Sequence, residues 1–313
     1  MRIIVSLPDQ ENEFQVMQAA DAKETAARLG IDLVLQDAES SAVLQIQQLL
    51  KAIHSDPPPQ ALIVEPISVE TMESVVRKAT RAGLGLALLN CTLESLESLR
   101  AQTPAVPVFA VGSDQVEIGR MQGRQLKALL PNGGHVLYIH GPQNGTCARE
   151  RYDGFRRETH GTGIEATVLD GHWSEASAEK AVTSWLRLKL WEKTPLCAIV
   201  AQDDAMARGA RRAVDALPEV AQRIGPAPLL GIDGVREVGQ QLVDKGLLAA
   251  TIVTASNTGP ALDLIAKWVR SGTMPMTSVH LPARAYPDAS LLQRRAARKI
   301  GPTNAPPKTA EAS

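Results

Sequence analysis

IVAQDDAMARGARRAV, residues 199–214, joins a short apolar run to two adjacent carboxylates, Asp203 and Asp204, and then to a helix of small residues. In a parallel α/β sheet, the carboxyl end of a strand opens into the crevice where ligands bind. One of the acids can cap the helix by accepting hydrogen bonds from its free N–H groups. We expect Asp204 to be this cap, which leaves Asp203 facing a polar-ligand site. The alternative is that both acids are only turn and cap residues.

The same alternation of short apolar runs with segments of helical period extends along the chain and predicts βαβ units with parallel sheets. The expected strands are rich in Val, Ile and Leu, as in sheets covered by helices on both faces. They lie at 2–7, 31–36, 61–64, 86–90, 108–112, 134–140, 164–169, 196–201, 228–232, 248–252 and 278–281. The expected helices lie at 14–29, 41–54, 69–82, 115–130, 146–160, 175–191, 204–216, 235–245 and 257–271. Roughly eleven strands exceed one small open sheet, so we expect an α/β fold with two lobes.

Composition excludes several classes of function. Of the 313 residues, 44% are hydrophobic and 21% charged, and the net charge of −1 lacks the basic excess that nucleic-acid binding needs. No stretch approaches the ~18 consecutive apolar residues of a membrane span. We therefore expect no nucleic-acid partner and no direct membrane insertion. Cys91, Cys147 and Cys197 have neither metal-ligand spacing nor a disulfide pattern, so we interpret them as small buried residues.

Polar residues at or just after the predicted strand ends are the candidate site. They are Ser6, Asn12, Glu65, Asn90, Ser113, Arg151, Asp203 and Asp233, whereas Asp114 directly precedes a helix and is expected to cap it. Carboxylates, amides and a guanidinium together suit a ligand with several vicinal hydroxyls, because each hydroxyl both donates and accepts. The sequence contains no GxGxxG, GxxxxGK[ST], GxSxG or HExxH motif. We therefore expect binding without catalysis, and no cofactor or metal.

Four segments in the correct order resemble the sugar-binding, ribose-binding-protein-like type I periplasmic binding proteins, which serve ABC transporters. They are GSDQVEIGRMQGRQL (112–126), GPQNGTCARERYDGF (141–155), AQDDAMARGARRAV (201–214) and LLGIDGVREVGQQLVDKGLLAATIV (229–253). The resemblance covers residues 2–285. It implies two Rossmann-like lobes with parallel sheets, joined by a three-segment hinge that closes on the ligand. The expected lobes are 1–113 plus 255–282 and 114–254 plus 283–290, and the Pro-rich, polar end 291–313 is expected to be a disordered tail.

The resemblance also assigns roles to individual residues. Ser6, Asn12, Asn90, Arg151, Asp203, Asp233 and Thr254 match positions that contact the ligand through polar groups, while Phe14 and Trp173 match aromatics that pack on a sugar ring. Phe and Trp also serve simply as core residues, so this alternative stays open for both. Gln15 and Ile232 stand where further aromatics are expected, and Glu65 and Asp203 are acids where amides are common. We hypothesise a pocket acidic enough to tolerate an amino group on the ligand.

The leading interpretation is a monomeric, non-enzymatic binding protein for a sugar or polyol, which delivers it to the permease of an ABC transporter. Such a role implies the periplasm or cell envelope. However, MRIIVSLP (1–8) runs straight into the first predicted strand and leaves no room for a signal peptide, so the chain is cytoplasmic if this start is correct. The main alternative is a cytosolic sugar-sensing domain related to repressor effector modules, without a DNA-binding domain. An enzyme on this scaffold is the third.

Overall fold

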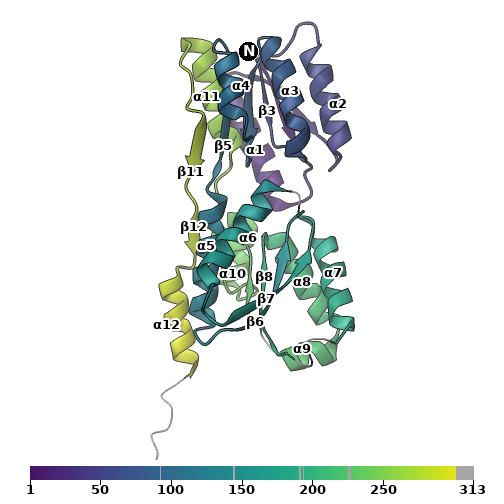
Figure 1. Ribbon diagram of the computed structural model, residues 1–313, viewed down its shortest axis with the longest axis vertical. Helices are drawn as coiled ribbons and strands as arrows, with labels where there is room; N and C mark the ends of the chain where they lie inside the picture. The colour runs from purple at the N-terminus through teal and green to yellow at the C-terminus, as the bar shows by residue number, and fades with distance from the viewer. Residues whose placement is uncertain (92, 144, 190–191, 193, 225–226, 301–313) are drawn as a thin grey trace, which may run out of the picture.

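Two sheets, each covered by helices on both faces, divide the chain into two lobes stacked along the long axis of the molecule (Figure 1). The computed structural model describes residues 1–313 except 92, 144, 190–191, 193, 225–226 and 301–313. This arrangement confirms the predicted α/β class with parallel sheets in two lobes.

The first lobe contains a parallel six-stranded sheet in the order β11-β5-β4-β3-β1-β2. Its strands are β1 (Arg2–Leu7), β2 (Asp32–Asp37), β3 (Ala61–Val64), β4 (Gly85–Leu89), β5 (Val108–Ser113) and β11 (Ser278–Leu281). Its helices are α1 (Glu13–Leu29), α2 (Ala42–Ile53), α3 (Val69–Arg81), α4 (Leu96–Gln102) and α11 (Thr258–Ser271). Neighbouring residues of a strand point to opposite faces. Leu62 therefore packs in the core with α2, α3 and α4, and Ile63 in the core with α1 and α11.

The second lobe is built on the parallel sheet β7-β6-β8-β9, extended by bridges to the antiparallel pair β10-β12. Its strands are β6 (Gly134–His140), β7 (Ile164–Asp170), β8 (Leu196–Ala201), β9 (Leu229–Leu230), β10 (Thr251–Val253) and β12 (Arg284–Tyr286). Its helices are α5 (Gln115–Leu129), α6 (Thr146–Thr159), α7 (Glu175–Arg187), α8 (Asp204–Asp215), α9 (Pro218–Ile224), the π-helical turn η2 (Arg236–Gln240), α10 (Gln241–Asp244) and α12 (Ala289–Ile300). Ile199 of β8 packs toward α7 and α8, and Val200 toward α5 and α6.

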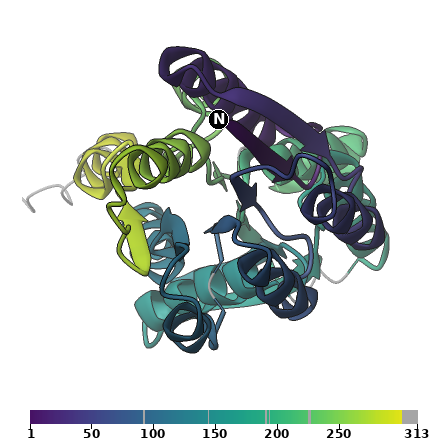
Figure 2. The ribbon, with the colours of Figure 1, turned by 90° about the horizontal axis from the view of Figure 1, so that it is seen from above.

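The chain passes between the lobes three times: from β5 to α5, from β10 to α11, and from β11 to β12. β11, β12 and α12 run along one side of the molecule (Figure 1 and Figure 2). The three-segment connection thus agrees with the predicted fold class. The residue boundaries given above for the two lobes stay a prediction.

The structure differs from the sequence-based expectation mainly in short elements. The helices α4, α9 and α12 and the strand β12 were not predicted. Residues 291–300 of the expected disordered tail belong to α12, and Leu292 is buried beside residues of α5 and α6. The rest of that expected tail, 301–313, lies outside the described residues. Within the described part of the chain, no helix is long and apolar enough to cross a membrane.

Candidate functional site

A cleft of about 380 Å³ lies between the lobes, at the carboxyl ends of strands from both sheets. Binding sites for small molecules generally occupy ~300–1,000 Å³, so its size suits a compact ligand. The first lobe lines it with residues that follow β1, β3 and β4, and the second lobe with residues that follow β6, β7, β8 and β9. Of the predicted site residues, the structure brings together Asn12, Phe14, Glu65, Asn90, Arg151, Trp173, Asp203 and Asp233.

Arg151 lines the cleft and is held by several partners, although its side chain is charged and only 6% of the residue is exposed. Its Nε donates to Gln115 Oε1 at 2.8 Å, and its Nη1 donates to the Gln202 carbonyl at 2.5 Å. The indole of Trp173 lies 5.5 Å from the guanidinium carbon, a cation–π contact. These partners leave part of the guanidinium fork available to a ligand.

Close packing of α5 against α6 sets the position of Arg151. A Cβ at Gly119 would lie 1.9 Å from the Arg151 carbonyl oxygen, and a Cβ at Gly154 would lie 1.9 Å from the Val116 carbonyl oxygen. Only glycine allows the two backbones to approach this closely. The glycines in the predicted helices 115–130 and 146–160 therefore determine where the arginine side chain begins.

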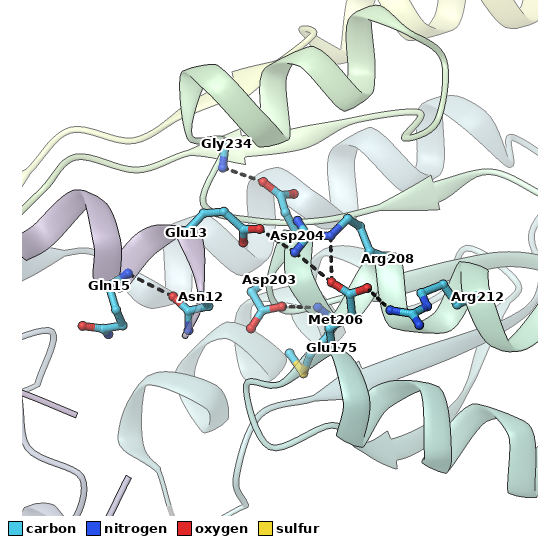
Figure 3. Close-up of polar contacts among 10 residues, drawn as sticks. All are labelled: Asn12, Glu13, Gln15, Glu175, Asp203, Asp204, Met206, Arg208, Arg212 and Gly234. Carbon is cyan, nitrogen blue, oxygen red and sulfur yellow. Dashed lines mark hydrogen bonds and ion pairs between the residues drawn. The ribbon is translucent and has the colours of Figure 1, made fainter. Parts of the chain in front are cut away.

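Asp203, and not Asp204, caps α8, which corrects the expectation from the sequence. Asp203 Oδ1 accepts from the Met206 N–H at 2.5 Å (Figure 3). Its Oδ2 is buried and has no hydrogen-bond partner among the described residues. Asp203 is 2% exposed and lines the cleft, so this one residue both caps the helix and presents an oxygen to the ligand site. Burial raises the pKa of Asp203 to about 6.

Asp204 is a buried structural carboxyl that links three segments of the second lobe. It accepts from the Gly234 N–H at 2.9 Å and from the Thr251 hydroxyl at 2.8 Å. Burial, with smaller contributions from the nearby Asp203 and Glu13 carboxylates, raises the pKa of Asp204 to about 7, although the hydrogen bonds from Thr251 and Gly234 oppose the shift. The Gly234 contact fixes the loop that carries Asp233.

Asp233 enters the cleft from a turn with unusual backbone geometry. Its φ is 101°, in the left-handed region that non-glycine residues rarely adopt, and it is 8% exposed. Hydrogen bonds from the Asp233 N–H to the Ile252 carbonyl and from the Thr254 N–H to the Asp233 carbonyl hold the turn. Burial raises the pKa of Asp233 well above its ordinary value, and the guanidinium of Arg151 opposes this shift. Such strain at a lining residue is a common property of functional sites.

Glu65 and Asn90 form the polar wall of the first lobe. Glu65 Oε1 accepts from Asn90 Nδ2 at 3.0 Å, and Glu65 Oε2 accepts from Gln18 Nε2 at 3.1 Å. Asn90 Oδ1 in turn accepts from Asn257 Nδ2 at 2.6 Å. Burial raises the pKa of Glu65, whereas the amide donors lower it. This chain of hydrogen bonds orients both side chains before any ligand arrives.

Three predicted ligand contacts do not line the cleft. Ser6 is fully buried inside β1, where its hydroxyl accepts from Gln45 Nε2. Ser113 ends β5, and Thr254 lies in the crossing after β10, where its hydroxyl bonds the Asp233 carbonyl. Asn12 does line the cleft, but its Oδ1 also accepts from the Gln15 N–H and caps α1.

Several residues that were not predicted from the sequence line the cleft, among them two cysteines. Cys91 and Cys147, interpreted as small buried residues, are half-buried and line the cleft. Burial raises the pKa of the Cys147 thiol to about 11, so it is a neutral thiol at physiological pH. The spacing of Cys147 and Arg151 on one helix, i and i+4, is a signal that would have placed both on the same face. Cys197 is also half-buried.

The prediction for Asp114 is confirmed: it caps α5, because its Oδ1 accepts a hydrogen bond from the Glu117 N–H.

Comparison with known proteins extends these observations. Residues 3–280 match the periplasmic binding protein domain family. The chain is 23% identical over 269 residues to the galactofuranose-binding protein YtfQ of Escherichia coli, covering 85% of this chain and 81% of the relative. It is 25% identical over 243 residues to the ribose import binding protein RbsB of E. coli, covering 77% and 75%. The crystal structure of a galactofuranose binding protein superposes with a TM-score of 0.81 at 20% identity, covering 96% of this chain and 98% of that one. The superposition supports the two-lobed fold.

Proposed function

Because the chain belongs to the periplasmic binding protein domain family, we propose that it binds a sugar or related polyol in the cleft between its lobes. The observation that carries the proposal is the set of oriented polar groups in that cleft. Arg151 supplies donors, Asp203 and Asp233 supply acceptors, and Asn90 supplies an amide. A ligand with several hydroxyls satisfies such a set, while an unmatched buried group would cost about 1–3 kcal/mol.

Ligand binding is coupled to the relative position of the lobes, since each lobe supplies part of the wall. Asn90 follows a strand of the first sheet, whereas Arg151 and Asp233 belong to the second lobe. A ligand that touches both lobes stabilises the closed arrangement by its additional contacts there. The three crossing segments are the natural hinge.

The protein acts by binding alone and hands its ligand to the permease of an ABC transporter at the cell envelope. Its relative, the ribose import binding protein RbsB of E. coli, is named for import, which supports an import role. The polar groups of the cleft are mainly carboxylates, amides and half-buried thiols, and the described lining residues include no nucleophile paired to a base. We therefore expect a bound sugar to be recovered chemically unchanged. We also expect the binding protein to be a monomer.

A ligand screen tests this function. Thermal unfolding is measured with pentoses, hexoses and inositols, and hits are confirmed by isothermal titration calorimetry. A ligand at 100 times its Kd should stabilise the protein by about 2.7 kcal/mol. Arg151→Ala should remove the stabilisation, whereas Arg157→Ala, an exposed arginine further along α6, should retain it. A hit whose effect survives Arg151→Ala would show that the ligand binds elsewhere.

A further inference from the structure

The side chains that line the cleft include more acidic than basic groups. Asp203 and Asp233 are buried, Asp9 and Glu65 are half-buried, and Glu11 and Glu70 are exposed to solvent. Among the described lining residues, Arg151 is the single arginine or lysine, and His172 is the one other side chain able to become positive. A neutral sugar would leave this imbalance in place.

Arg151 cannot compensate the buried acids by itself. Two of its donors are already engaged by Gln115 and the Gln202 carbonyl. The remaining positive charge is shared between Asp203 and Asp233, both of which it attracts. A buried carboxylate without a counter-charge is unfavourable, and at these positions burial already raises the pKa of both acids.

Asp203 supplies the independent observation that points to a ligand. Its Oδ1 is used by the helix cap, while its Oδ2 points away from α8 and lacks a partner among the residues that the structure describes (Figure 3). Buried polar atoms are almost always hydrogen-bonded, so an unpaired carboxylate oxygen in a ligand cleft indicates a donor supplied from outside the chain.

We propose that the ligand carries a protonated amino group in addition to its hydroxyls, and that Asp203 with Asp233 receives this ammonium. The proposal rests on the proposed function and narrows its substrate class to amino sugars and aminated polyols. An ammonium has three donors and no acceptor, which suits a carboxylate pair. Its hydrogen bonds to carboxylates are stronger than those of a neutral hydroxyl because both partners are charged. The negative charge of the Asp203 and Asp233 carboxylates should repel sugar acids and sugar phosphates, so these ligands should not bind.

Matched pairs of ligands test the proposal by isothermal titration calorimetry near neutral pH. The pairs are D-glucose with D-glucosamine, D-galactose with D-galactosamine, D-sorbitol with D-glucamine, and myo-inositol with an inosamine. In at least one pair the amine should bind about 10-fold more tightly or better, since a hydrogen bond to a charged group is stronger than one between neutral groups. N-acetylation of that amine should remove the gain.

The variant Asp203→Asn tests whether the Asp203 carboxylate is the group that binds the ammonium. Asparagine also caps helices, so this variant should fold. It should reduce the preference for the amine over its neutral partner by about 10-fold, because the amide keeps an acceptor oxygen for a hydroxyl but has no charge for an ammonium. The matched control is Asp153→Asn, which removes the same charge from an exposed position on α6 and should leave the preference unchanged.

The outcomes separate this inference from the proposed function. If neutral members bind and every amine binds equally or more weakly, the ammonium site is wrong and the sugar-binding function stands. If no ligand of either kind binds, both are wrong. A preference that survives Asp203→Asn, or is lost equally in Asp153→Asn, contradicts the role of Asp203. Should Asp203→Asn unfold, the comparison of amine, N-acetylated amine and neutral partner on the unmodified chain still decides.

Discussion

Asp203 and Asp204 are adjacent in sequence, yet their side chains belong to different parts of the molecule. Asp203 turns toward the cleft at the start of α8, while Asp204 points into the second lobe and bonds Gly234 and Thr251. The orientation of the first turn of α8 decides which of the two side chains faces the cleft and which faces the interior of the second lobe. This direction depends on the position of the Asp233 loop, which is distant in sequence.

The raised pKa of Asp204 predicts a pH dependence of stability. Its folded-state pKa, about 7, lies above the ordinary value of 3.8, so the folded state holds a proton that the unfolded chain has released. The stabilisation is complete below the ordinary pKa and is lost as the pH rises through the folded-state value. The free energy of unfolding should therefore fall between pH 4 and pH 7 by an amount on the order of a few kcal/mol.

Asp204→Asn should flatten this dependence, because an amide can accept from the Gly234 N–H and donate to the Thr251 hydroxyl without titrating. Urea unfolding of both proteins at intervals across the pH range measures it. The pKa values of Asp203 and Asp233 are also raised, so these residues contribute to the same dependence of stability on pH. Asp204→Asn should therefore reduce the slope of unfolding free energy against pH without abolishing it. An unchanged slope would show that Asp204 is already ionised in the folded protein.

Most of the lining residues could be predicted from the sequence, but the role of each residue could not. The rule that ligands meet the carboxyl ends of parallel strands placed Asn90, Asp203 and Asp233 at the cleft. It failed for Ser6, which lies one residue before the end of β1 with its hydroxyl turned toward Gln45. Side-chain direction at a strand end changes with every residue, so a shift of one position moves a group from the ligand to the core.

Secondary-structure elements that are buried on both faces could be predicted from the sequence. Elements that are stabilised mainly by packing against residues distant in sequence could not. Strands such as β3 and β4 are fully apolar, because helices cover both of their faces. In contrast, α12 reads as a basic, Pro-flanked tail, and its stability comes from Leu292 packing against the second lobe. A short helix gains most of its stability from such packing, which the local pattern does not contain.

The close packing of α5 against α6 should be essential for both stability and ligand affinity. Gly154→Ala would place a Cβ 1.9 Å from the Val116 carbonyl, so the two helices must separate. Forced separation of this kind typically costs about 1–3 kcal/mol. Because Arg151 is anchored on α6 and bonded to Gln115 on α5, the affinity for the ligand should fall as well.

Urea unfolding and calorimetric titration together check this expectation. Asp153→Ala is the control, since Asp153 neighbours Gly154 on the same helix but faces solvent. It should leave both stability and affinity nearly unchanged. Wild-type affinity in Gly154→Ala would mean that the position of Arg151 does not depend on the helix spacing.

The two lobes are connected by an ion pair as well as by the three crossing segments of the chain. Arg208 on α8 of the second lobe lies 2.5 Å from Glu13 on α1 of the first lobe, and 2.9 Å from Glu175 within its own lobe (Figure 3). Glu13 does not line the cleft, so this contact is separate from ligand recognition. The pair can form only when the lobes are close together.

Glu13→Gln should therefore weaken ligand binding without touching the ligand. Loss of the pair lowers the population of the closed state, and the apparent Kd rises in proportion. Each side chain of the pair is about a quarter exposed, at 26% and 24%. Solvent-accessible pairs typically contribute about 0.2–1 kcal/mol, which corresponds to an increase in Kd of up to roughly fivefold. Arg212→Ala is the matched control, because Arg212 pairs with Glu175 and Glu179 inside the second lobe only. Calorimetry should show the increase in Glu13→Gln alone, and small-angle scattering of the ligand-free protein should show a larger radius of gyration. Equal effects of the two substitutions would mean that the cross-lobe contact does not control closure.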